Sequence, residues 1–150
     1  TEVDTLSLHD ALPILKNLHL FMKLVNDPNS PAAIGPYSHA VKSGKLLFTS
    51  GQIPIDPLTS SLVEDEITVQ TNQVINNLSS ILESQGLSLE NIIKTTVFLK
   101  DMNEFKEFNT VYEERFSNHK PARSTIEVAS LPLDCRVEIE AIAEITSNQE

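Results

Sequence analysis

Two stretches of the chain repeat their hydrophobic residues at the spacing of a helix. In residues 66–85, one apolar stripe contains Ile67, Val74, Leu78, Ile81 and Leu82. In residues 103–116, the stripe contains Phe105, Phe108, Val111, Tyr112 and Phe116. A stripe of this kind is the buried side of an amphipathic helix. We expect Asp65 to cap the first helix and Gly86 to end it, because these residue types prefer those positions.

Other segments are rich in β-branched or alternating hydrophobic residues and predict strands. They comprise a hairpin at 38–50 and strands at 92–100, 122–128 and 136–145. The hairpin turns at Ser43-Gly44, where glycine supplies the backbone conformation that a tight turn needs. The order β-β-α-β-α-β-β predicts an α+β domain, in which two helices cover one face of a single mixed sheet.

Alternation along the last two strands assigns their residues to the two faces of the sheet. In 136–145, the face expected to pack under the helices contains Val137, Ile139, Ala141, Ala143 and Ile145. Glu138 therefore projects from the other face. In 122–128, Ile126 and Val128 point one way, and Arg123 and Thr125 point the other. We expect Arg123 and Glu138 to share the face without helices, which should pack on another subunit because such a mixed face is rarely left bare.

Residues 1–25 differ from the rest because they lack a clean hydrophobic period. A loop signal follows at 27–31, and we expect the folded domain to span 26–150. Within the extension, residues 6–14 resemble translated sequencing-adapter read-through, which would make Met22 the natural start. A natural helical extension explains the same residues equally well. Under either explanation, residues 1–25 lie outside the predicted fold.

Composition narrows the range of functions. The 150-residue chain carries a net charge of −10, whereas proteins that bind nucleic-acid backbones usually carry the opposite sign. The single cysteine, Cys135, cannot form an internal disulfide, and no segment is long and apolar enough to cross a bilayer. We therefore expect a cytoplasmic protein. The four histidines are scattered without the spacing of metal ligands, so no metal site is expected.

Two positions near the start of the domain could contact a ligand. Gly35-Pro36 forms a rigid turn that presents Tyr37, although an aromatic plug at the start of a strand explains the same pattern. A strand ends at Ser50-Gly51, where a glycine lets the backbone approach a ligand closely. The alternative at this second position is an ordinary turn.

Two charged residues near the end of the chain could carry chemistry. Arg123 can bind a carboxylate with both arms of its guanidinium, or it can form a surface ion pair. Glu138 can act as a general acid and base, or it can lie on a solvated strand face beside Glu140 and Glu144. From these residues alone, the sequence indicates an α+β domain with a candidate Arg/Glu site.

The segments around these positions resemble one family. Five of them match it in order and lie within three-quarters of the chain, at 32–38, 50–54, 94–101, 121–124 and 137–143. The chain is similar to the Rid family of reactive-intermediate deaminases, also called the YjgF type, and most to its RidA branch. The resemblance implies a chorismate-mutase-like fold for residues 26–150, assembled as a homotrimer with sites between subunits.

The resemblance also implies an activity. Such proteins hydrolyse short-lived 2-imino acids and their enamine tautomers, such as 2-aminoacrylate, to 2-keto acids and ammonia. This 2-iminobutanoate/2-iminopropanoate deaminase activity uses no cofactor. One alternative is a regulatory trimer that binds 2-keto acids without turnover. Another is a ribonuclease-type translation inhibitor, which the net charge of −10 disfavours.

The family's functional residues fall on matching positions of this chain. Its carboxylate-binding arginine falls on Arg123, and its acidic residue, which orients or activates water, falls on Glu138. The other substrate-binding positions are Tyr37, Ser50, Gly51, Asn109 and Thr125. Many members have cysteine where this chain has Thr125, but the expected mechanism needs no nucleophile there.

Overall fold

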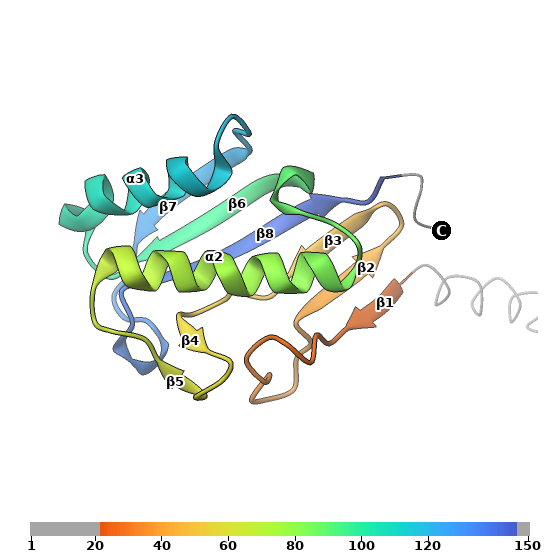
Figure 1. The fold of residues 1–150 in the computed structure, drawn as a ribbon, viewed down its shortest axis with the longest axis horizontal. Coiled ribbons are helices and arrows are strands. Elements are labelled where there is room, and N and C mark those ends of the chain that lie inside the picture. Colours follow the sequence, from red (N-terminus) through yellow and green to blue (C-terminus); the bar gives the residue numbers. More distant parts are fainter. Residues whose placement is uncertain (1–21, 147–150) are drawn as a thin grey trace, which may run out of the picture.

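The computed structural model describes residues 22–146 and contains a six-stranded main sheet. The strands lie in the order β1-β2-β3-β8-β6-β7 (Figure 1). Their bounds are Met22–Val25 (β1), Ala40–Ser43 (β2), Leu46–Thr49 (β3), Ile92–Leu99 (β6), Ala122–Glu127 (β7) and Val137–Glu144 (β8). Neighbouring strands are antiparallel except β6 and β7, which are parallel, so the sheet is mixed.

Two helices, α2 (Ile67–Ser84) and α3 (Phe105–Phe116), cover one face of this sheet (Figure 1). The hydrophobic core lies between the helices and the sheet. On the helix side, β8 buries Val137, Ile139, Ala141 and Ala143, as its alternation predicted. The predicted α+β architecture, with both helices on one face of a mixed sheet, is confirmed.

The two glycines predicted to shape turns have left-handed backbones. Gly44 has a φ of 58° in the hairpin, where Ser43 pairs with Leu46 across the turn. Gly86 has a φ of 69° directly after α2, and the backbone N–H of the next residue, Leu87, donates to the Leu82 carbonyl at 2.9 Å. Hydrogen bonds of this kind satisfy the last carbonyl groups of a helix.

Several short elements were not predicted. A second, two-stranded sheet pairs β4 (Ile55–Asp56) with β5 (Ser61–Leu62). Three 3₁₀ helices, η1 (Leu89–Asn91), η2 (Met102–Glu104) and η3 (Pro132–Asp134), lie beside longer elements. Elements of two or three residues are too short to show a hydrophobic period, so the sequence pattern does not reveal them.

The sheet begins at Met22, ahead of the domain start expected at residue 26. Strand β1 pairs with β2, so that Leu24 lies opposite Val41. Three of the four β1 residues are exposed, which is why alternation did not mark this edge strand. The expectations for residues 1–21 lie outside the described residues.

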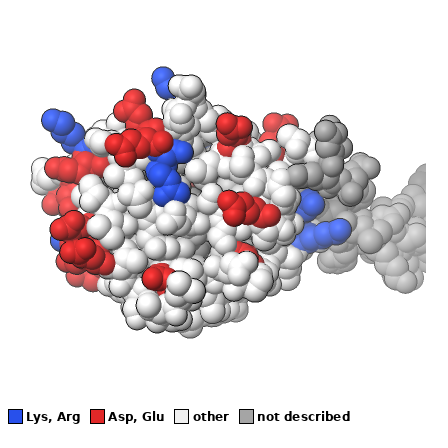
Figure 2. All heavy atoms as spheres, viewed as in Figure 1, with Lys and Arg blue, Asp and Glu red and all other residues white. Residues whose placement is uncertain are grey.

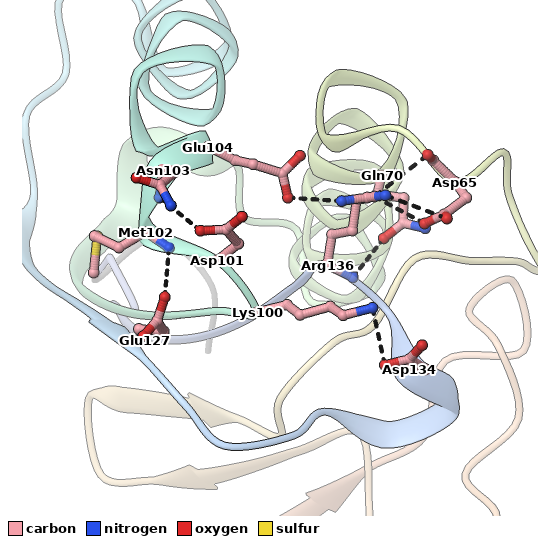
Figure 3. Close-up of polar contacts among 10 residues, drawn as sticks. All are labelled: Asp65, Gln70, Lys100, Asp101, Met102, Asn103, Glu104, Glu127, Asp134 and Arg136. Carbon is pink, nitrogen blue, oxygen red and sulfur yellow. Dashed lines mark hydrogen bonds and ion pairs between the residues drawn. The ribbon is translucent and has the colours of Figure 1, made fainter.

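Arg136, directly before β8, joins the beginnings of both helices to the sheet (Figure 3). Its guanidinium donates to Asp65 at 2.8 Å and to Glu104 at 2.9 Å, and its backbone N–H donates to the Gln70 side chain at 2.8 Å. The prediction that Asp65 caps α2 was wrong, because the cap residue is Glu66 and makes no side-chain cap bond. The ion pair with Arg136 takes the Asp65 carboxylate instead, and it fixes the strand that carries Glu138.

Candidate active site

Arg123, in β7, lies against one face of α3. Its guanidinium carbon is 4.7 Å from the ring centre of Tyr112, 5.6 Å from that of Phe105 and 5.8 Å from that of Phe108. Its Nη1 atom donates to Asn109 Oδ1 at 2.9 Å. Helical spacing places these four α3 residues on one face, and cation–π attraction stabilises a guanidinium over aromatic rings. The side chain is therefore held in place before any ligand arrives.

The expectation that Arg123 and Glu138 share the helix-free face was wrong for Arg123. In the β6–β7 pairing, Arg123 lies opposite Thr95, whose side chain is buried on the helix side. Glu138 lies opposite Phe98 and projects from the helix-free face. The prediction assumed that the apolar side of β7 faces the helices. In fact Ile126 is exposed on the helix-free face.

A cavity of about 390 Å³ adjoins Arg123 between the end of α3 and the start of β7. Asn109 and Tyr112 line it, together with Lys120. The described residues contain no acidic partner in ion-pair contact with Arg123, and none that accepts a hydrogen bond from its Nε or Nη2. The guanidinium therefore keeps donors for an anionic ligand. Thr125 lies on the same face two residues along, where its buried hydroxyl has no hydrogen-bond partner.

Glu138 lies against Gly51, in the segment that leaves β3. A Cβ added at Gly51 would overlap the Glu138 carboxyl group, whose carbon would be only 2.9 Å away. A bridge between Gln52 and Ile139 holds the two segments together. A side chain at position 51 would therefore require the Glu138 carboxyl group to move away.

The Glu138 carboxyl group has an unusual electrostatic environment. Burial raises its pKa, and the charge of the neighbouring Glu140 raises it further. Within residues 22–146, no cation or hydrogen-bond donor pairs with it. A raised pKa brings a carboxyl group closer to the neutral range, where it can both accept and donate a proton.

Tyr37 lies in the loop before β2, and Ser50 directly follows β3. Hydrogen bonds hold these two segments together at several points. The Ser50 hydroxyl donates to the Ser38 carbonyl at 2.6 Å, and the Ser50 N–H donates to the His39 carbonyl at 2.8 Å. His39 is buried and joins two ends of the preceding loop: its Nδ1 accepts from the Asp27 N–H at 2.9 Å, and its Nε2 lies 2.7 Å from the Pro31 carbonyl. The segment that carries Tyr37 is therefore fixed from both sides. No sequence pattern indicates this role of His39, because both partners become its neighbours only in the fold.

A hollow of about 230 Å³ connects several of these residues. Tyr37, Gly51 and Gln52 line it together with Ile53 and Leu133. Tyr37 and Gly51 therefore share this hollow, whereas Ser50 precedes Gly51 in the chain and the Glu138 carboxyl group lies against Gly51 without lining the hollow. The structure brings Arg123, Asn109 and Thr125 into another region.

The two regions are separate within one chain. Strand β6 lies between β7, which carries Arg123, and β8, which carries Glu138. Arg123 is opposite Thr95 of β6, and Glu138 is opposite Phe98, which is three residues further along β6. Strand spacing and rise convert this to about 14 Å between Cα atoms, with the side chains on opposite faces. One small ligand cannot contact both groups of the same chain. A shared site needs Arg123 from one copy and Glu138 from another.

Other kinds of site receive no support from the described residues. Burial raises the pKa of the Cys135 thiol to about 11, so the reactive thiolate is scarce near neutral pH. Residues 22–146 contain no group of three or more His, Cys, Asp or Glu side chains placed to hold a metal ion. Neither α2 nor any other helix in this part of the chain has the length and apolar character needed to cross a membrane.

Known proteins resemble this chain in sequence and in fold. The model of the family described as endoribonuclease L-PSP matches residues 27–145. A RutC family protein of Pyrococcus horikoshii is 55% identical over 115 residues, which are 77% of this chain and 91% of that protein. The 2-iminobutanoate/2-iminopropanoate deaminase of Salmonella typhimurium is 48% identical over 124 residues, which are 81% and 96% of the two chains. The crystal structure of the Escherichia coli YjgF gene product has a TM-score of 0.78 at 46% identity, over 81% of this chain and 98% of that one. This chain therefore belongs to the endoribonuclease L-PSP family, which includes the Rid and YjgF proteins.

Proposed function

We propose that this protein hydrolyses 2-imino acids and their enamine tautomers to 2-keto acids and ammonia. Arg123 binds the substrate carboxylate and Glu138 assists the attacking water. The site lies between two copies of the chain, most simply in a homotrimer. Relatives about 48% identical carry the name 2-iminobutanoate/2-iminopropanoate deaminase, which supports this reaction class.

The observation that carries the proposal is the state of Arg123. Its guanidinium is enclosed by aromatic rings and bonded to Asn109, yet no acidic side chain of the described residues pairs with it. A structural arginine usually forms an ion pair. One that is positioned without a partner suits a carboxylate ligand, which two parallel N–H groups of the fork can bind.

The reaction needs water addition and proton transfers. The imine reacts in its protonated form, so its nitrogen needs no further proton when water adds. Glu138 removes one proton from water as the water oxygen bonds to the imine carbon, and the electron pair of the C=N π bond moves to the nitrogen. Glu138 then gives this proton to the nitrogen, the C–N bond breaks and ammonia leaves. The hydroxyl group becomes the keto group as its proton passes to the Glu138 carboxylate. General acid–base help of this kind contributes roughly 10²–10⁴-fold. Such a contribution is sufficient for a substrate that already hydrolyses in water.

The direct test combines the purified protein with an enzyme that releases a 2-imino acid, and follows the appearance of the keto acid. We expect acceleration over the spontaneous rate. Arg123→Ala should remove the acceleration. Lys106→Ala, which removes an exposed cation from the neighbouring helix α3, is the matched control. Spontaneous rates with the wild-type protein would refute the proposal.

The separation of the two regions keeps one alternative open. Arg123 with Asn109 could bind a 2-keto acid even if Glu138 never reached it, which would make the protein a binding module. Keto-acid binding without deamination would favour this alternative. The family description carries the word endoribonuclease, but the chain has a net charge of −10 and the face in Figure 2 shows no continuous basic stripe. Backbone phosphates need such a stripe.

A further inference from the structure

Asn77 is a buried polar residue of α2 whose side chain bonds to a segment outside the helix. It is 2% exposed, and its Nδ2 atom donates to the Ile53 carbonyl at 3.1 Å and to the Ile55 carbonyl at 2.9 Å. Its Oδ1 accepts from Gln73 Nε2, one turn earlier on the helix, at 2.9 Å. Both ends of the amide are therefore engaged, which fixes the orientation of the side chain.

The segment that Asn77 holds lies outside the main sheet. Pairing of this segment with β8 ends at the bridge between Gln52 and Ile139. Strand β4, which begins at Ile55, belongs to the small second sheet beside α2 (Figure 1). Carbonyl groups inside a protein need hydrogen-bond partners. A side chain of α2 provides a donor to two of them here, in place of a neighbouring main-sheet strand.

The same segment brings Gly51 close to Glu138. Gly51 precedes the bridge residue Gln52, and a Cβ added at Gly51 would lie only 2.9 Å from the carboxyl carbon of Glu138. Ile53 directly follows Gln52. The backbone from Gly51 to Ile55 is thus attached at two places, to β8 at Gln52 and to α2 through Asn77.

We propose that Asn77 is a positioning residue for the proposed reaction, because it holds Gly51 against the Glu138 carboxyl group through the Ile53 and Ile55 carbonyl groups. The backbone then covers one side of the carboxyl group and limits the access of water to it. This inference rests on the proposed function, and it adds a residue of α2 that acts on Glu138 through the intervening segment.

The surroundings of Glu138 make this cover important. Burial is the main cause of its raised pKa, and the charge of Glu140 adds to it. The segment from Gly51 to Ile55 carries no charge, and neither does Phe98, which lies opposite Glu138. The cations of the adjoining strands bond elsewhere, in the pairs Lys94–Ser124, Lys100–Asp134, Arg136–Asp65 and Arg136–Glu104. Loss of the backbone cover should therefore lower the pKa of Glu138 towards its ordinary value.

The first test follows the titration of Glu138 by NMR of the whole protein with isotope-labelled glutamate carboxyl groups. Glu138→Gln identifies the signal, because it alone loses that resonance. Asn77→Leu has a side chain of similar shape and no charge, but it leaves both carbonyl groups without their donor. We expect the titration midpoint of Glu138 to move to lower pH in this variant. An unchanged midpoint would overturn the inference.

The second readout is the pH profile of deamination. The plateau value of kcat should fall by about tenfold in Asn77→Leu, because a small displacement and a weaker base both slow proton transfer. The decrease of kcat towards acidic pH should move to lower pH together with the NMR midpoint. A midpoint that moves while the pH profile keeps its wild-type position would also overturn the role in the reaction.

Two further variants separate positioning from general loss of stability. Val74→Ala removes buried volume from the same helix but no polar group, so it should lower Tm and leave the midpoint unchanged. Asn77→Ser keeps one hydroxyl donor and should give a smaller shift, and it replaces Asn77→Leu if that variant does not fold. A shift in Val74→Ala as large as that in the Asn77 variants would overturn the inference, because instability alone would then explain it.

The absence of deamination by the wild-type protein would end the deaminase proposal and, with it, the role of Asn77 in that reaction. The NMR titration would still decide whether Asn77 holds Gly51 against Glu138. A midpoint that moves to lower pH in Asn77→Leu but not in Val74→Ala would support this contact, and equal midpoints in all three proteins would overturn it.

Discussion

Arg123 lies on the helix face of the sheet with three aromatic rings of α3 around its guanidinium, whereas Glu138 lies on the opposite face with no charged partner in the described residues. Side chains hold the arginine. The glutamate is held by its strand and by the close backbone approach of Gly51. Side-chain contacts restrict the direction of a charged group, while burial without a partner changes its proton affinity.

This difference fits two separate tasks. A group that binds an anion gains from being positioned in advance, because little conformational freedom is lost when the ligand arrives. A group that transfers protons gains from a pKa near the operating pH, and burial beside Glu140 shifts Glu138 in that direction.

Loss of the Arg123 side chain should have the largest effect. Removing one partner of a buried, hydrogen-bonded charge pair costs about 4 kcal/mol, which is roughly 10³-fold in kcat/KM. Arg123→Lys should recover little, because an ammonium cannot form two parallel bonds with a carboxylate. Steady-state rates on 2-iminopropanoate measure both variants. Near wild-type kcat/KM in Arg123→Lys would show that charge alone, and not the fork, binds the substrate.

Glu138→Gln should lower kcat by about 10²-fold while it stabilises the fold at neutral pH. Because the folded-state pKa is raised, the folded protein binds more protons than the unfolded chain between the ordinary and the raised value. The free energy of unfolding therefore falls as pH rises through this window. Glutamine carries no charge at any pH, so the variant does not show this fall in the free energy of unfolding. Its Tm should therefore be higher than that of the wild-type protein at pH 7 and equal to it at pH values below the ordinary carboxyl pKa.

The pH profile of the wild-type protein gives the matching readout. If the Glu138 carboxylate accepts the proton of water, kcat should fall as pH decreases through its raised pKa. Glu138→Gln should lose this dependence, whereas Glu140→Gln should shift the fall to lower pH by removing a neighbouring charge. A lower Tm for Glu138→Gln at pH 7 would show that the carboxylate makes a stabilising contact.

Mixing the two inactive variants tests whether the two regions meet across subunits. In a mixture of equal amounts of Arg123→Ala and Glu138→Gln chains, a site built from two copies is intact only when one copy supplies Arg123 and the other supplies Glu138. Each condition has a probability of one half, so both hold with a probability of one quarter. About one quarter of wild-type activity should therefore return in a closed ring of subunits. A site within one chain would give no recovery. The separation of about 14 Å on opposite faces predicts recovery.

The sequence predicted the main elements because each shows a clear period. The stripe of α2 and the alternation of β8 indicate burial directly, and both were confirmed. The face of Arg123 was predicted wrongly, because parity relates residues within one strand but does not say which side of an edge strand meets the helices. Here Ile126 is exposed on the helix-free face of the edge strand β7.

Features that depend on distant segments had no signal in the sequence. The fixation of the loop by His39 joins residues 12 positions apart through a ring nitrogen. The pairing of Arg136 with Asp65 spans 71 positions. Leu133 looks like an ordinary exposed leucine until its left-handed backbone and its place beside the hollow are seen. The segments that resemble the family single out Arg123 and Glu138 as candidates. Only the strand register shows that the two residues lie on opposite faces of the sheet.

The smallest expected effect concerns Asn109, which orients the guanidinium without carrying charge. Its Oδ1 accepts from Arg123 Nη1 at 2.9 Å, and a hydrogen bond to a charged group is worth about 1.5–3 kcal/mol. The aromatic rings remain in Asn109→Ala, so Arg123 should keep part of its position and KM should rise roughly tenfold with little change in kcat. Thr110→Ala, an exposed neighbour on the same helix, controls for general loss of helix stability. A fall in kcat with unchanged KM would instead place Asn109 at the reaction centre. The region around Arg123 would then take part in proton transfer as well as in binding, and the two regions would no longer have separate tasks.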